Sequence, residues 1–282
     1  MADRRRGTTS LKGHVAVVIG GGSGVGRGIA LALSEAGARV MVADVQAKRA
    51  SAVVVEAVGE GGCASAATVD ATDRASLQEL ARRLTEEHGA LHILVNTTGT
   101  IIDRSLDRAT DAEWEWMVNA NLFTQVRSVA VLLPLMRESG GFRHIVTTAA
   151  LAGFAAPSAT GAHLGLYSSV KHAVVGYSDA LREELRDEGI GVSLLLPHRV
   201  KGNLAENSAR SLARATDDHS GVGAVDPPAG ELTPARVVGP IVVAAIQRRQ
   251  RYVLTRPADL TAVQQRYREL LNATPPHASL LP

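Results

Sequence analysis

Short apolar runs alternate along the chain with longer segments in which apolar residues recur at helical spacing. The short runs have the length and content of buried strands. They cover residues 14–20, 39–45, 63–70, 91–99, 142–150, 191–197 and 251–255. The segments between them predict helices over residues 26–37, 47–59, 74–89, a long stretch from about 111, 167–189 and 233–248. Thr110 and Glu113 have capping-box spacing at the start of the long stretch.

This alternation predicts one α/β domain built on a doubly wound parallel sheet, Rossmann-like, with about seven strands and helices on both faces. We expect a flexible tail over residues 1–11, a dinucleotide-binding and catalytic domain over 12–257, and a C-terminal helix and tail over 258–282. The polar stretch 198–232 has no clear periodicity, and we interpret it as a substrate lid.

Composition narrows the classes of function. Apolar residues make up 45% of the 282 residues and charged residues 21%, so a sizeable core is expected. The net charge is +2 and no basic stripe is present, which argues against a nucleic-acid partner. A single cysteine, the absence of an 18-residue apolar run and the absence of a signal-peptide pattern favour a soluble cytoplasmic protein without a membrane partner. We expect no metal site.

Ligands of doubly wound sheets bind beyond the carboxyl ends of the strands, so the residues that follow each strand carry the candidate chemistry. Gly20, Gly24 and Gly26 follow the first strand, where glycines let the backbone approach a pyrophosphate at a helix N-terminus. Asp44 ends the second strand, 18 residues after Gly26, where an acid accepts hydrogen bonds from an adenosine ribose and repels a 2′-phosphate. NAD(H) is therefore favoured over NADP(H). The alternative for Asp44, and equally for Asp70 after the third strand, is a capping role.

Tyr167 and Lys171, in the stretch "YSSVK", lie four residues apart in a predicted helix and therefore on one face. A free tyrosine has a pKa near ~10, too high for a base at neutral pH. A neighbouring ammonium favours the phenolate and lowers that pKa, which would suit acid–base catalysis. The alternative is an ordinary pair on a solvated helix.

The motifs "GGGSGVG" (20–26), "VNTTG" (95–99), "NANL" (119–122) and "YSSVK", together with Asp44 and the strand order, resemble the short-chain dehydrogenases/reductases over roughly residues 12–256. The resemblance implies an NAD(P)-dependent oxidoreductase that interconverts an alcohol and a ketone or aldehyde by hydride transfer. It implies that Tyr167 is the general acid/base, that Lys171 holds the nicotinamide ribose and lowers the tyrosine pKa, and that Asn121 keeps a water for proton relay. It also implies a homodimer or homotetramer.

The cofactor contacts that follow from the strand-end pattern and the resemblance form one set. They are Gly20, Gly22, Ser23, Gly24, Val25, Gly26, Asp44, Val45, Asp70, Ala71, Asn96, Thr97, Thr98, Gly99, Tyr167, Lys171, Pro197 and Val200.

The sequence departs from the family pattern after the fifth strand. The family places a serine three residues before the glycine that closes this motif, and Ala150 stands there. Thr148 points to the opposite face of the strand from Ala149, so we do not count it as a substitute. Losing one preorganised donor typically costs ~10²–10³ in rate. We regard Ala150 and His198 as substrate contacts, and Ser158, Thr160 or His163, in a long loop, as candidates to supply a hydrogen bond instead. The alternative for each of these three is a solvent-facing polar group of the loop.

Positions 150 and 198 leave two functions open. The first is a dehydrogenase or carbonyl reductase with a nonstandard site. The second is a cofactor-binding protein of the same fold without ordinary redox turnover, either a pseudoenzyme subunit or a repurposed non-redox catalyst, for example in secondary metabolism. The substrate is expected to be an apolar or mixed small molecule, because leucines populate the lid region. These are Leu164, Leu166, Leu204 and Leu212.

Overall fold

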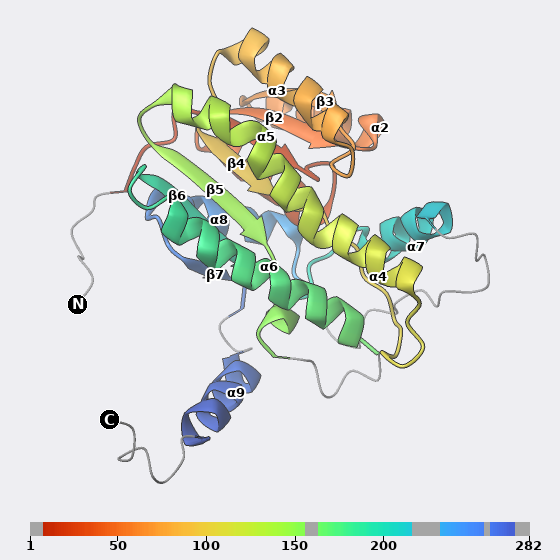
Figure 1. Ribbon diagram of the computed structural model, residues 1–282. Coiled ribbons are helices and arrows are strands. Elements are labelled where there is room, and N and C mark those ends of the chain that lie inside the picture. The colour runs from red at the N-terminus through yellow and green to blue at the C-terminus, as the bar shows by residue number, and fades with distance from the viewer. Residues whose placement is uncertain (1–7, 156–162, 216–231, 257–259, 274–282) are drawn as a thin grey trace.

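A computed structural model describes residues 8–155, 163–215, 232–256 and 260–273 (Figure 1). Its centre is a seven-stranded sheet in the order β3-β2-β1-β4-β5-β6-β7, with every adjacent pair parallel. The predicted fold class is therefore confirmed. The strands are β1 (Val15–Ile19), β2 (Arg39–Asp44), β3 (Cys63–Thr68), β4 (Ile93–Asn96), β5 (Arg143–Thr148), β6 (Ile190–Leu196) and β7 (Tyr252–Leu254).

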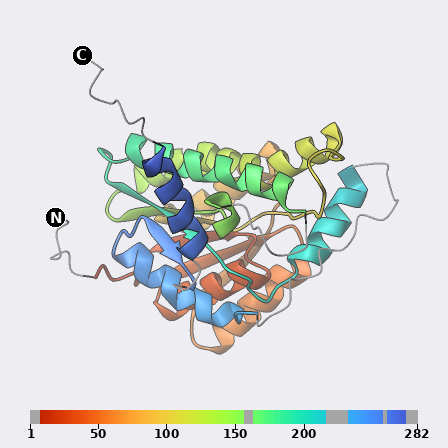
Figure 2. The same cartoon turned by 90° about the horizontal axis from the view of Figure 1, so that it is seen from below.

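Helices cover both faces of the sheet, and two separate apolar clusters lie between the sheet and these helices. Strands β1, β4 and β6 are buried along their whole length, which explains why they read as continuous apolar runs. Figure 2 shows α6 and α8 on opposite sides of the sheet. One cluster is closed by α1 (Gly24–Glu35), α2 (Ala47–Gly59) and α8 (Ala235–Gln247), and the other by α3 (Arg74–His88), α5 (Thr124–Ser139) and α6 (Gly165–Glu184).

The long stretch from residue 111 is not one regular helix. It divides into α4 (Asp111–Val118), a π-helical turn η1 (Asn119–Phe123) and α5. The predicted capping box is confirmed, since Thr110 and Glu113 bond reciprocally at the start of α4. Single π turns inside helices occur often at functional sites, and this one contains Asn121.

The stretch 198–232, which shows no clear periodicity in the sequence, contains α7 (Leu204–Ala215) in its first half, so the expectation of an irregular segment there is wrong. Among the described side chains of α7, Ser208 and Leu212 are the buried ones. The role of the stretch as a substrate lid stays a prediction. The second half of the expected lid, residues 216–231, lies outside the described residues. A last helix, α9 (Thr261–Asn272), stands beside the body of the domain. In the part of the chain that the structure describes, no helix is long and apolar enough to cross a membrane.

Candidate active site

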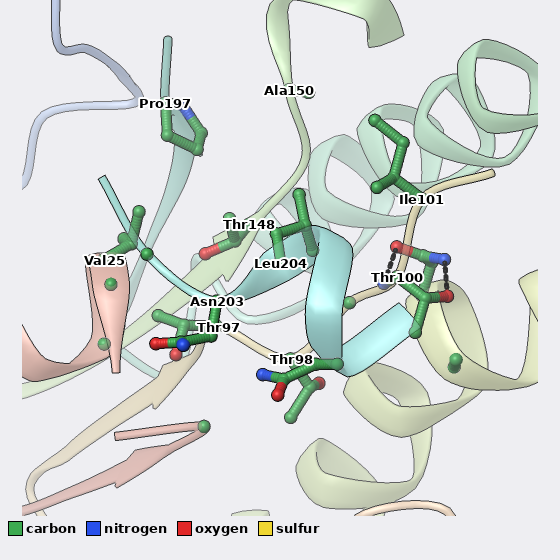
Figure 3. A pocket seen from close by; sticks show the side chains of 18 of the residues that line it. Val25, Thr97, Thr98, Thr100, Ile101, Thr148, Ala150, Pro197, Asn203 and Leu204 are labelled. Carbon is green, nitrogen blue, oxygen red and sulfur yellow. Dashed lines mark hydrogen bonds between the residues drawn. The ribbon is translucent and has the colours of Figure 1, made fainter. Parts of the chain in front are cut away.

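A cavity of about 1260 Å³ opens beyond the carboxyl ends of the strands. It runs from the glycine-rich turn after β1 and Asp44 at the end of β2 to Tyr167 and Lys171 on α6. Figure 3 shows part of its lining, with Val25 and Thr97 on one side and Thr100 and Ile101 on the other. The position agrees with the rule that ligands of such sheets bind at this edge.

The glycine-rich turn is folded tightly enough to exclude side chains. Gly20 has a φ of +78°, and a Cβ there would lie 2.9 Å from Thr97 Oγ1. A Cβ at Gly26 would lie 2.1 Å from the carbonyl oxygen of Gly20. The turn thus presents the N-terminus of α1 to the cavity, with Ser23 and Val25 in the lining. Backbone N–H groups and the positive end of the helix dipole at this place fit the pyrophosphate of a dinucleotide.

Asp44 stands next to this turn, and its carboxylate is already fixed by the backbone. Oδ2 accepts a hydrogen bond from Gly22 N and Oδ1 accepts one from Gln46 N, each at 2.9 Å. A carboxylate offers about four acceptor positions, so further ones remain for ribose hydroxyls. Asp70 also lines the cavity, and its Oδ1 accepts bonds from both the N–H and the hydroxyl of Thr72. The N-caps of α2 and α3 are Gln46 and Asp73, so the capping alternative is wrong for both Asp44 and Asp70.

Tyr167 and Lys171 are not a solvated pair. Their side chains lie in the cavity wall with only 9% and 3% of each residue exposed, and Lys171 Nζ is 5.5 Å from the centroid of the Tyr167 ring. Lys171 Nζ also donates to the carbonyl oxygen of Thr148 at 3.4 Å. The geometry of the predicted pair is therefore present, and the solvated alternative is wrong.

The electrostatics of this pair differ from the expectation that Lys171 lowers the tyrosine pKa. Burial raises the pKa of Tyr167 above its ordinary value. Burial also lowers the pKa of Lys171 to about 7. Desolvation, which disfavours the charged form of each group, is the cause of both shifts. Lys171 is thus poised to lose or gain a proton near neutral pH.

Asn121 is held beside Lys171 by a network that the π turn makes possible. Its Nδ2 donates to Met117 O at 3.0 Å and to Thr100 Oγ1 at 3.1 Å, and its Oδ1 accepts from Thr100 N at 3.1 Å. A Cβ at Gly99 would lie 2.8 Å from Asn121 Oδ1 and 3.2 Å from Lys171 Nζ, so the two side chains meet over that glycine.

Gln125 is a positioning residue that the sequence did not reveal. Its Nε2 donates to Asn121 O and to Thr148 O, and its Oε1 accepts from Thr148 N, all at 2.9 Å. The fully buried amide therefore ties the π turn to the end of β5. Its place four residues after Asn121 was the only signal available.

Thr148, Ala149 and Ala150, at and just after the end of β5, all line the cavity. Ala150 is buried and brings no hydroxyl. The Oγ1 of Thr148 is buried as well, and it has no hydrogen-bond partner within the described residues. Thr148 thus brings to the cavity wall a buried hydroxyl without a partner among the described residues, which makes it a residue to test as a substitute donor, although the sequence interpretation had set it aside.

Most of the predicted site residues line this one cavity. They are Gly20, Ser23, Gly24, Val25, Gly26, Asp44, Val45, Asp70, Ala71, Thr97, Thr98, Gly99, Asn121, Ala150, Tyr167, Lys171, Pro197, His198 and Val200.

Three predicted residues do not belong to the described lining. Gly22 lies behind Asp44 and supports it. Asn96 is buried with its Oδ1 accepting from Ser128 Oγ at 2.6 Å. His163 is exposed, with its Nδ1 3.2 Å from Asp103 Oδ1, so it does not supply the expected hydrogen bond in this geometry. Ser158 and Thr160 lie outside the described residues.

The sequence missed the residues that complete the cavity away from the glycine-rich turn. Trp116 on α4 lines it and donates from Nε1 to Ser211 Oγ on α7 at 3.3 Å. Ile101 follows β4 closely, and its place just after a strand could have identified it as a cavity residue. Trp116 and the α7 residues reach the cavity only through packing of α4 against α7, which no local pattern shows. The α7 residues that the sequence missed are Ala205, Asn207, Arg210, Ser211 and Ala215.

Comparison with known proteins agrees with this geometry. Residues 14–213 match the short chain dehydrogenase family. The chain is 33% identical over 196 residues to C alpha-dehydrogenase of Sphingobium sp. strain SYK-6, which covers 69% of this chain and 63% of that protein. It is 29% identical over 235 residues to the 3-oxoacyl-[acyl-carrier-protein] reductase FabG of Vibrio harveyi, covering 83% of this chain and 90% of that protein.

A solved structure of a short chain dehydrogenase/reductase from Burkholderia phymatum, in complex with NAD, superposes with a TM-score of 0.85 at 28% identity. The match covers 94% of this chain and 96% of that chain. The family match, the parallel sheet and the cavity at its carboxyl edge lead to one assignment. The chain belongs to the short-chain dehydrogenase/reductase family.

Proposed function

We propose that the protein is an NAD(H)-dependent oxidoreductase that interconverts an alcohol and a ketone or aldehyde. Family membership supports NAD(P)-dependent oxidoreduction in general terms. The observation that carries the proposal is the buried Tyr167–Lys171 pair in the same cavity as the glycine-rich turn and Asp44. One cavity thus joins a dinucleotide cradle to a proton-transferring group.

A nicotinamide cofactor would supply or accept the hydride, and the chain's own residues manage binding and the proton. The α1 N-terminus and Asp44 would hold the pyrophosphate and adenosine end of that cofactor. Tyr167 donates its hydroxyl proton to the carbonyl oxygen during reduction and takes it back during oxidation. Burial lowers the pKa of Lys171 to about 7, so Lys171 would exchange a proton with Tyr167 near neutral pH. The carboxamide of Asn121 lies next to Lys171. It would orient a water that returns a proton to Tyr167 by way of Lys171.

The part of the cavity beyond Tyr167 is largely apolar, which supports an apolar or mixed substrate. Figure 3 shows Ile101 and Leu204 facing this space. Trp116 adds a large aromatic surface. A ketone or aldehyde with an apolar body would bury against these groups and leave its oxygen as the main polar contact.

Ala150 supports a second candidate function. The polar donor that the family serine would give is replaced by a methyl group in the cavity wall. A protein that binds the cofactor without ordinary redox turnover, as a pseudoenzyme subunit or a non-redox catalyst, would tolerate this. The two candidates separate in one assay, in which NADH absorbance is followed with a panel of apolar ketones and aldehydes, and NAD⁺ with the matching alcohols. Turnover on any member supports the oxidoreductase, and NADH binding without turnover on all members supports the second candidate.

The choice of NAD(H) over NADP(H) rests on Asp44. We expect the protein to bind NADH at least ~10-fold more tightly than NADPH, about 1.4 kcal/mol, because a 2′-phosphate would face the carboxylate. Asp44→Ala should narrow this ratio, since it removes both the ribose acceptor and the repulsion. Isothermal titration calorimetry with both cofactors measures the effect. Equal affinities in the unaltered protein would contradict the assignment.

We also propose that the protein is a homodimer or homotetramer. The outward surface of α6 carries small exposed residues, Ala173, Gly176 and Ala180, over which another helix can pack closely. Figure 1 shows α5 running alongside α6, so the two helices form a broad surface together. Light scattering at micromolar concentration should give a mass of two or four chains, and a monomeric mass would argue against this proposal.

A further inference from the structure

Two arginines share one glutamate at the edge of the cavity. Arg210 Nη2 lies 2.6 Å from Glu206 Oε1, both on α7. Arg49, at the start of α2, reaches the same oxygen with Nη2 at 3.4 Å and donates from Nη1 to Asn207 Oδ1 at 2.8 Å. Asn203 Nδ2 donates to the other oxygen, Oε2, at 2.8 Å. The Glu206 carboxylate is therefore fixed between two guanidinium groups.

This cluster lies at the corner where the adenosine ribose is proposed to bind. A Cβ at Gly22 would lie 2.7 Å from Asp44 Oδ2 and 2.8 Å from Arg49 Cβ. The carboxylate of Asp44 and the Cβ of Arg49 therefore flank the same glycine. Asn207 and Arg210 line the cavity together with Asp44. The ribose corner thus combines one ribose-binding acid with two arginines from α2 and α7.

Arginine guanidinium groups are the side chains best suited to bind a phosphate, because they offer paired N–H donors to its oxygens. Asp44 alone is therefore an incomplete account of cofactor choice, since two potential phosphate ligands stand beside it. The Glu206 carboxylate lies between the two guanidinium groups and pairs with both of them.

We propose that Glu206 is a specificity-determining residue, which disfavours NADP(H) by neutralising Arg49 and Arg210 at the ribose corner. The inference rests on the proposed function, because it concerns the same cofactor. It adds that the choice of cofactor depends on α7, a helix that also lines the substrate side through Ser211.

The test is Glu206→Gln, which keeps the size of the side chain and removes its charge. The dissociation constants of NADH and NADPH are measured by calorimetry, with adenosine 5′-monophosphate and adenosine 2′,5′-bisphosphate as probes of the corner alone. Affinity for NADPH and for the bisphosphate should rise about fivefold, which corresponds to the contribution of one exposed ion pair. Affinity for NADH and the monophosphate should change less than about twofold. The gain should shrink as salt is raised, because these charges are exposed.

Two further variants separate a local effect from a general one. Glu183→Gln makes the same charge change in an exposed pair with Arg186 on α6, and it should leave both affinities unchanged. Adding Arg49→Gln to Glu206→Gln should remove the gain in NADPH affinity. An unchanged NADPH affinity in Glu206→Gln, with NADH still bound, would overturn the inference and leave the proposed function intact. Failure of the unaltered protein to bind NADH would instead reject the proposed function and this inference with it.

Discussion

Turnover is expected to disappear in the Tyr167→Phe variant while NADH binding survives. The substitution keeps the ring, which lies in the cavity wall almost wholly buried, and removes only the hydroxyl that transfers the proton. Loss of a general acid–base group typically lowers the rate by ~10²–10⁴. Steady-state kcat on a responsive ketone and the NADH dissociation constant measure the two parts of this expectation.

A matched control is available on the same helix. Tyr177 lies two to three turns further along α6 and packs against the apolar cluster under α3 and α5, away from the cavity. Tyr177→Phe removes an equivalent hydroxyl and should leave kcat nearly unchanged. A retained rate in Tyr167→Phe would move the proton transfer to another group, and His198, which lines the cavity, is the first to examine.

Ala150→Ser is expected to raise kcat by up to ~10²-fold, the contribution of one preorganised donor to a developing oxyanion. The substitution adds a single oxygen at a position that already lines the cavity, so the packing should tolerate it. NADH affinity should stay nearly unchanged, because the new hydroxyl is expected to donate a hydrogen bond to the substrate oxygen and not to the cofactor. Steady-state kinetics of both forms on one carbonyl substrate give the answer.

A different result would point to a rebuilt site. If the buried hydroxyl of Thr148 already serves as the donor, a new serine would compete with it, and kcat would stay flat or fall. Thr148→Val would then lower kcat, and Thr148→Ser, which keeps the hydroxyl, would not. A flat Ala150→Ser together with a loss in Thr148→Val would reject the missing-hydroxyl account.

The sheet and much of the site could be predicted from the sequence because local patterns determine them. A fully buried strand such as β1 needs a continuous apolar run, and the turn after it needs glycines for a backbone with positive φ and no room for a Cβ. Asp44, Tyr167 and Lys171 follow from the same logic, because the end of a strand or one face of a helix places them. Chain position alone therefore brought them to one edge of the sheet.

The remaining features depend on contacts between distant segments. Gln125 bonds both to the π turn around Asn121 and to the end of β5, and no periodicity signals that contact. The place of helix α7 depends on contacts with α4 and α2, through Ser211 and Asn207, which no local pattern shows. His163 was expected near the substrate, but Asp103, sixty residues earlier, holds it at the surface. The tyrosine pKa was expected to fall, but burial, which a sequence does not show, raises it.

The most direct test of the central claim is to follow the hydride itself. NADH carrying deuterium at nicotinamide C4, with each face labelled in turn, is incubated with the protein and the panel of apolar ketones and aldehydes, and the products are analysed by mass spectrometry. The account predicts that at least one carbonyl becomes an alcohol carrying one deuterium from one face of the cofactor, and that Tyr167→Phe abolishes this transfer. NADH that binds but delivers no deuterium to any carbonyl would contradict the account and leave a cofactor-binding protein without redox turnover.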